Sequence, residues 1–177
     1  KRRVWDCCAA SGGKSIMAVD MLGDIKLTVS DLRESILINL RKRFATAGIK
    51  EYKSFVSDLS VKRLPESDDK FDIVIADVPC SGSGTWGRTP EQLFYFKEEM
   101  VEQYARLQKQ IMSNVLHHVS PGGYILYITC SVFKAENEEV VNWYLKQNQL
   151  NLIKMELLKG YSFKADTMFA ALMQKPL

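Results

Sequence analysis

The chain has 177 residues, of which 46% are hydrophobic and 25% charged, and its formal net charge is +3. This balance is typical of one globular domain with its own core, and it excludes disordered and fibrous proteins. Because no apolar run approaches the ~20 residues of a membrane span and no secretory leader opens the sequence, we expect a cytoplasmic protein without a membrane partner.

Short β-rich runs alternate with segments of helical spacing. The predicted strands are residues 3–7, 25–30, 52–56, 71–76 and 124–129, and the predicted helices are residues 14–22, 34–47, 98–119 and 136–147. This alternation indicates an α/β fold, an open parallel sheet with helices on both faces. Two further apolar stretches, residues 152–158 and 168–173, predict an antiparallel edge that completes about seven strands.

The sequence predicts one domain over residues 1–177, in which the polar stretch 65–70 is the only plausible flexible segment. Its four cysteines include no C-x-x-C pair and lie apart from both histidines, so we expect reduced thiols and no metal site. Basic clusters at residues 1–3, 41–43 and 62–63 permit a nucleic-acid partner, although most such clusters are solvated faces.

The first predicted strand runs into a turn of small residues, 6–14, that precedes a helix. Such a turn lets backbone N–H groups approach a nucleotide-like cofactor, although a simple tight turn has the same composition. The dinucleotide motif G-x-G-x-x-G is absent, and a phosphate-binding loop needs a glycine where Cys8 stands. Both mismatches count against a dinucleotide enzyme or an NTPase.

Acidic residues follow the second and third predicted strands. Asp31 is placed to hydrogen-bond the hydroxyls of a ribose, or else to cap the following helix. Asp58 occupies the same position after the third strand and is placed to meet an adenine amino group. Together with the loop after the first predicted strand, these residues bring three strand ends toward one ligand, which predicts an adenosine-like cofactor.

Two cysteines, Cys80 and Cys130, follow adjacent predicted strands, and polar turn residues flank each of them. A buried core cysteine is the simpler interpretation of either one alone. It is harder to sustain for two thiols at the same rim of a parallel sheet, so we expect them to take part in chemistry.

The chain resembles the Fmu/Sun-type family of RNA (cytosine-5) methyltransferases over nearly its whole length. The resemblance is carried by Cys8-Ala9-Ala10-x-Gly12-Gly13-Lys14, Asp77-Val78-Pro79-Cys80-Ser81-Gly82-x-Gly84, Arg88-x-Pro90, Thr129-Cys130-Ser131 and Glu136-Asn137-Glu138. It implies a Rossmann-like class I fold, S-adenosylmethionine as cofactor and 5-methylcytosine in RNA as product. Ribosomal RNA is the favoured substrate, and transfer RNA is second.

The resemblance also implies roles for individual residues. Asp31 would hold the ribose, Asp58 the adenine ring, and Asp77 would face both the cofactor and the target cytosine. Cys130 would be the nucleophile, Cys80 would assist product release, and Lys14 would lie near both cofactor and base. The methionine part of the cofactor would be held by Cys8, Ala9, Ala10, Ser11, Gly12, Gly13 and Lys14.

The chemistry explains why two thiols are useful, because carbon 5 of cytosine accepts a methyl group only after a thiolate has added at carbon 6. DNA enzymes use the cysteine of a Pro-Cys pair, which makes Cys80 the alternative nucleophile. Since neither thiol can reach a base inside a duplex, we expect a single-stranded or flipped-out cytosine.

Two positions depart from the family pattern. Ser11 replaces a usual proline, from which we expect a less rigid cofactor loop, and residues 166–169 lack a glycine that usually precedes Phe169. The early first strand also favours a catalytic fragment without its N-terminal RNA-recognition region. The alternatives are therefore a methyltransferase for transfer RNA, DNA or protein, or a cofactor-binding fragment that is inactive alone. No feature indicates an oligomeric state.

Overall fold

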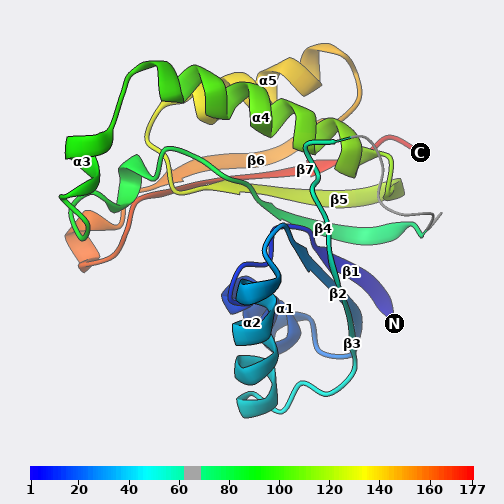
Figure 1. The fold of residues 1–177 in the computed structure, drawn as a ribbon. Coiled ribbons are helices and arrows are strands. Elements are labelled where there is room, and N and C mark those ends of the chain that lie inside the picture. The colour runs from blue at the N-terminus through cyan, green and yellow to red at the C-terminus, as the bar shows by residue number, and fades with distance from the viewer. Residues whose placement is uncertain (62–68) are drawn as a thin grey trace.

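The computed structural model describes residues 1–61 and 69–177, which form one seven-stranded sheet in the order β3-β2-β1-β4-β5-β7-β6 (Figure 1). Strands β1 to β5 run parallel, and β7 pairs antiparallel with both β5 and β6. The strands are β1 (Arg2–Asp6), β2 (Ile25–Asp31), β3 (Tyr52–Val56), β4 (Phe71–Asp77), β5 (Val119–Thr129), β6 (Asn151–Leu158) and β7 (Met168–Gln174). The basic pair Lys62-Arg63 and most of the polar stretch 65–70 lie outside the described residues.

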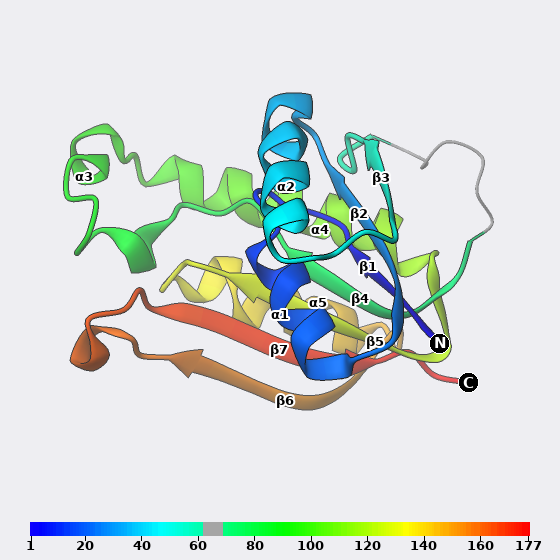
Figure 2. The ribbon, with the colours of Figure 1, turned by 90° about the horizontal axis from the view of Figure 1, so that it is seen from below.

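Helices cover both faces of the sheet (Figures 1 and 2). The helices are α1 (Gly13–Leu22), α2 (Glu34–Thr46), α3 (Gln92–Tyr95), α4 (Glu99–Leu116) and α5 (Glu138–Lys146), with short 3₁₀ turns η1 (Ser83–Thr85), η2 (Lys134–Glu136) and η3 (Tyr161–Phe163). Helices α1 and α2 pack on one face and α4 and α5 on the other. Within the part of the chain that the structure describes, no helix is long and apolar enough to cross a membrane.

Two apolar layers make up the core, because successive residues of a strand point to opposite faces. Val4 of β1 lies in the layer beneath α1 and α2, and its neighbour Trp5 lies in the layer beneath α4 and α5. Trp5 is fully buried, packs against Phe71, and donates from its ring N–H to Ser30 Oγ at 3.0 Å. Burial on both faces fixes the central strands and therefore the positions of their carboxyl ends.

The predicted fold class is confirmed, including the antiparallel edge. One boundary was wrong: α4 ends at Leu116, and Val119 begins β5 rather than ending the helix. The Pro-Gly-Gly sequence at residues 121–123 hid the start of this strand. There β5 bulges against β4, Gly122 has φ of 70°, and a Cβ on Gly123 would press on Ser120 O.

The second difference concerns the segment after β5. Helix α5 begins at Glu138 rather than at Glu136, because residues 134–136 form the 3₁₀ turn η2. The Glu136 side chain is consequently fully buried at the carboxyl edge of the sheet. The four-residue helix α3, which follows Pro90, was not predicted.

Candidate active site

The loop between β1 and α1 lies across the carboxyl ends of the central strands. Its backbone is held by Ala9 N, which donates to Ser30 O at 2.8 Å, and by a left-handed Gly12 with φ of 82°. A Cβ at Gly12 would overlap the Phe44 ring of α2. No side chain caps α1, so its first N–H groups face the loop and are open to a ligand.

Asp31, at the end of β2, ties this loop to the sheet. Its Oδ2 accepts from Ala10 N at 3.0 Å, and its Oδ1 accepts from Arg33 N at 3.0 Å. The N-cap residue of α2 is Arg33, so the capping alternative for Asp31 was wrong in its position, although Asp31 does accept an N–H near that end. The side chain is nearly buried at the carboxyl end of β2, and its proposed contact with a ribose stays a prediction.

Ser11, which replaces the usual proline, has a compensating partner. Arg43 of α2 donates from Nη1 to Ser11 O at 3.0 Å and to Ser11 Oγ at 2.7 Å. The basic cluster 41–43 thereby holds the loop from outside. The loss of rigidity expected from Ser11 is offset by a contact that a proline side chain could not make.

Asp58 lies on the exposed side of the site. It accepts from Ser60 N at 2.9 Å and from Ser60 Oγ at 2.6 Å, and these bonds hold the pKa of its carboxyl below the ordinary value. The carboxylate is therefore ionised and oriented at the carboxyl end of β3. Its proposed contact with adenine stays a prediction.

Asp6 is a residue whose importance sequence reasoning missed. It ends β1, is fully buried, and accepts from Ser15 Oγ at 2.6 Å, whereas its Oδ1 has no hydrogen-bond partner among the described residues. Burial raises the pKa of Asp6 from 3.8 to about 7. A buried polar group without a partner is costly, which marks the base of the loop as a strained position.

The Asp6→Asn variant tests this state. Because the carboxyl is protonated in the folded chain and ionised in the unfolded chain between pH 4 and 7, the free energy of unfolding of the unaltered protein should fall across that window, by up to ~1.4 kcal/mol per pH unit. Asn cannot ionise, so the variant should lack this decline. Urea unfolding at pH 5 and pH 8 measures it, and parallel pH profiles of the two proteins would contradict it.

Lys14 and Asp77 form an ion pair at the centre of the site. Lys14 Nζ lies 2.6 Å from Asp77 Oδ2, and both side chains are about three-quarters buried. Burial raises the pKa of the Asp77 carboxyl, and the Lys14 ammonium opposes that rise. The pair joins the cofactor loop to the end of β4.

The two thiols predicted to share a rim are in contact. Cys80 Sγ lies 3.3 Å from Cys130 Sγ, and each thiol is part-buried. The hydrogen bond from Cys80 lowers the pKa of Cys130, while the same contact and burial raise the pKa of Cys80. The lowered pKa of Cys130 and the raised pKa of Cys80 favour Cys130 as the more reactive thiol of the pair.

This asymmetry predicts an order of alkylation. At pH 8 we expect iodoacetamide to modify Cys130 before Cys80, as read by peptide mass spectrometry. Replacing Cys80 by Ala removes the donor and should slow Cys130 modification several-fold, whereas Cys80→Ser retains a hydroxyl donor and should slow it less. Equal rates in the Ala and Ser variants would show that the hydrogen bond does not set the reactivity.

Glu136 holds the two cysteine loops together, a role that the sequence did not reveal. Its Oε1 accepts from Ser81 N at 2.7 Å, and its Oε2 accepts from Ser81 Oγ at 2.6 Å and Ser131 Oγ at 2.5 Å. Ser81 follows Cys80, and Ser131 follows Cys130. The carboxylate thus clamps the residue next to each thiol. The one signal in the sequence was the family motif Glu136-Asn137-Glu138, which implied no role for this carboxylate.

We expect Glu136→Ala to lower the free energy of unfolding by ~3 kcal/mol, because it leaves Ser81 N without its acceptor, removes the carboxylate that accepts from both serine hydroxyls, and opens a cavity at a fully buried position. Glu139→Ala, an exposed position three residues further along in the first turn of α5, is the matched control and should change stability by less than about 0.5 kcal/mol. Urea denaturation measures both. A similar loss in both variants would exclude the clamp.

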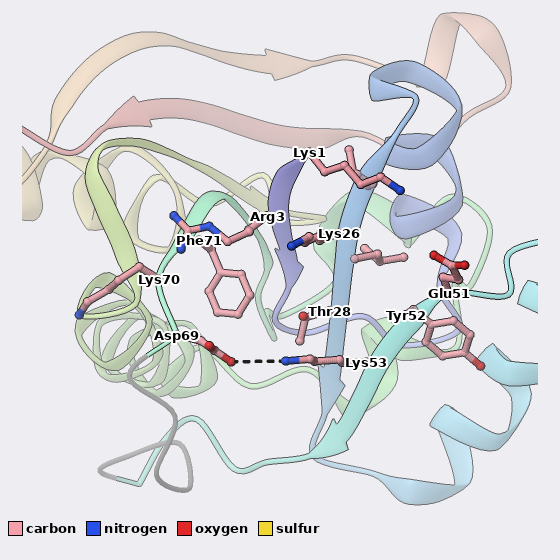
Figure 3. A pocket seen from close by; sticks show the side chains of 12 residues that line it. Lys1, Arg3, Lys26, Thr28, Glu51, Tyr52, Lys53, Asp69, Lys70 and Phe71 are labelled. Carbon is pink, nitrogen blue, oxygen red and sulfur yellow. Dashed lines mark ion pairs between the residues drawn. The ribbon is translucent and has the colours of Figure 1, made fainter.

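A hollow of about 520 Å³ lies elsewhere, at the amino ends of β1, β2 and β3 (Figure 3). Its cations are largely paired: Lys1 with Asp24, Arg3 with Asp72, and Lys53 with Asp69 at 3.8 Å. It is at the opposite end of the sheet from the thiols. Among residues 1–61 and 69–177, no three His, Cys, Asp or Glu side chains gather in a group that could hold a metal ion.

The strand order and the loop after β1 define a Rossmann-like fold of the methyltransferase class. The 16S rRNA methyltransferase RsmB/F family model matches residues 1–174. The chain belongs to this family, and the family expected from its motifs is confirmed.

Relatives in the same family are longer than this chain. Ribosomal RNA small subunit methyltransferase B of Klebsiella pneumoniae (strain 342) is 29% identical over 147 residues, which are 81% of this chain and 33% of that protein. The human 28S rRNA (cytosine(4447)-C(5))-methyltransferase is 31% identical over 160 residues, which are 85% of this chain and 19% of that protein. The chain thus spans a third or less of the length of these two relatives.

Solved structures agree with the fold. PH0851 superposes with a TM-score of 0.89 at 29% identity, over 98% of this chain and 42% of that chain. NSun6 from Pyrococcus horikoshii, solved with SFG, superposes with a TM-score of 0.88 at 21% identity, over 99% of this chain and 48% of that chain.

Proposed function

We propose that this chain transfers the methyl group of S-adenosylmethionine to carbon 5 of a cytosine in RNA, with ribosomal RNA as the favoured substrate, through a covalent adduct with Cys130. The observation that carries the proposal is the contact of Cys130 with Cys80 at 3.3 Å, beside the pair of Lys14 and Asp77. Methyl transfer to nitrogen or oxygen needs no thiol adduct. The names of the relatives, two kinds of ribosomal RNA methyltransferase, support the substrate class.

The residues present fit the cofactor. The uncapped start of α1 and the left-handed Gly12 leave backbone N–H groups open beside the loop, and Asp6 Oδ1 is an acceptor without a partner among the described residues. Residues 8–14 would hold the methionine part, Asp31 the ribose and Asp58 the adenine. Bound there, S-adenosylmethionine supplies an electrophilic methyl group.

The thiolate and the ion pair divide the work on the base. The Cys130 thiolate forms a bond to carbon 6 of cytosine, and the electron pair displaced from the ring double bond makes carbon 5 nucleophilic. Asp77, held by Lys14 at 2.6 Å, would hydrogen-bond the ring nitrogen and amino group as charge develops. Once carbon 5 carries the methyl group, a base takes its proton and the sulfur–carbon bond breaks.

We propose that Cys80 serves the exit step. As the hydrogen-bond donor to Cys130, it stabilises the thiolate that leaves when the adduct breaks. The lowered pKa of Cys130 and the raised pKa of Cys80 favour this division over the DNA-type alternative, in which Cys80 attacks. We also propose a single-stranded or flipped-out target, because both thiols are part-buried and cannot reach a stacked base.

A reducing compartment suits this chemistry. The four cysteines of the chain are free thiols in the structure, and the proposed reaction needs two of them reduced. Cytosolic thiols are kept reduced by glutathione and thioredoxin. We therefore place the protein in the cytoplasm as part of the proposal.

Trapping of the adduct tests the reaction and the nucleophile together. The protein is incubated with S-adenosylmethionine and RNA that contains 5-fluorocytosine, in which fluorine takes the place of the proton that must leave. We expect a covalent RNA–protein band on denaturing gels from the unaltered chain and from Cys80→Ala, but none from Cys130→Ala. Cofactor binding, followed by calorimetry, should be the same in all three.

The other outcomes are decisive as well. Loss of the band in Cys80→Ala alone would make Cys80 the nucleophile. Absence of a band from every protein, with cofactor still bound, would overturn the proposed reaction. A band of equal strength with 5-fluorocytosine DNA would overturn the substrate class.

A further inference from the structure

Four exposed aromatic side chains stand at one end of the molecule. Phe94 and Tyr95 of α3 are 86% and 73% exposed, and Tyr161 and Phe163 of η3 are 69% and 83% exposed. Figures 1 and 2 both place α3 and the β6–β7 connection at the same end, beyond the carboxyl ends of β4 and β5. We call these four residues the aromatic rim.

The rim is attached to the cysteine loops on both sides. Gly84 N donates to Cys130 O at 2.8 Å, and Gly84 O accepts from Thr167 N at 3.0 Å. Arg88, which precedes α3, forms an ion pair with Asp166 at 2.9 Å. Two segments more than 60 residues apart in the sequence are therefore joined next to the proposed nucleophile.

Both parts of the rim rest on ordered supports. Behind α3, the rings of Trp86, Phe96 and Phe133 pack together, with centroids 4.9 Å apart for Trp86 and Phe96. In the other part, Gly160 O accepts from Phe163 N at 2.8 Å, and a Cβ on Gly160 would overlap the backbone that follows. A backbone that is already fixed loses less conformational entropy when a ligand binds to the side chains that it carries.

Exposed lysines lie beside both parts of the rim, together with Glu91 and Glu98 around α3. Lys97 follows α3, and Lys159 and Lys164 flank η3; all three are exposed. None of the ion pairs formed by the described residues includes these lysines. Exposed rings interleaved with cations are the combination that binds single-stranded nucleic acid, because bases stack on the rings and phosphates pair with the cations.

We propose that the aromatic rim stacks on the unpaired bases that flank the target cytosine and holds the strand across the two thiols. This inference rests on the proposed function, since it requires an RNA substrate. The hydrogen bond of Gly84 N to Cys130 O ties the rim to the thiol loop, so a single strand that crosses the rim can present its own base to the thiols, which a protein partner has no base to do. The occupant is therefore RNA.

Binding of a short single-stranded RNA tests the rim. The probe is a fluorescently labelled run of uridines around one 5-fluorocytosine, and anisotropy gives its Kd without S-adenosylmethionine. Phe94→Leu and Phe163→Leu keep an apolar side chain but remove the ring, so each should raise Kd about fivefold or more. Phe94→Tyr and Phe163→Tyr keep the ring and should bind within about twofold of the unaltered chain.

The same RNA with abasic sites beside the 5-fluorocytosine completes the test. It should bind the unaltered chain as weakly as the leucine variants bind the intact RNA, and the leucine substitutions should weaken it no further. The proposed role of the rim is wrong if the leucine variants bind the intact RNA with the same Kd as the tyrosine variants. It is also wrong if the unaltered chain does not bind the RNA.

Adduct formation on gels separates the two proposals. If the adduct forms but the leucine substitutions leave the RNA affinity unchanged, the proposed reaction is supported and the proposed role of the rim is wrong. If RNA binding depends on the rings but no adduct forms, the role of the rim is supported and the proposed reaction is wrong.

Discussion

The buried carboxylate of Glu136 is the constraint on which the site depends. Pairing of β4 with β5 brings the carboxyl ends of these two strands to one edge of the sheet, but it does not fix the loops that follow them. Glu136 closes that gap by accepting hydrogen bonds from Ser81 and Ser131, each the neighbour of a thiol. The contact between Cys80 and Cys130 follows from this clamp rather than from the strands alone.

Charge and burial give the clamped thiols different characters. Cys130 lies at the edge where Lys14 pairs with Asp77, and it is in contact with Cys80. This contact lowers the pKa of Cys130 and, together with burial, raises that of Cys80, so two identical side chains differ in acidity because of their positions. Lys14 belongs to the loop proposed to hold the cofactor, and Asp77 is proposed to face the target base. Their ion pair therefore links the two proposed binding sites.

Local patterns predicted the strands, the helices and the two thiols, because each depends on residues close together in the chain. The short helix α3 and the start of β5 were missed beside prolines and glycines, whereas the contacts that organise the site escaped prediction because they join partners far apart in sequence. The η2 turn directs Glu136 inward, and only the folded sheet supplies Ser81 as its partner, 55 residues away. Likewise, the sequence alone predicts a less rigid loop at Ser11, because the hydrogen bonds from Arg43 come from 32 residues away. Helix and strand periodicity carries no information about such pairs.

Gly84 separates two parts of the molecule that can change at different rates. A side chain there would collide with the carbonyl oxygens of Thr167 and Cys130, so this position is closed to substitution. The exposed rings of Phe94 and Phe163 lie just beyond it and contribute little to the packing that fixes the thiols. Under the role proposed for the rim, a lineage could therefore exchange those rings and change how tightly a single strand is held, while the geometry of the two thiols stays the same.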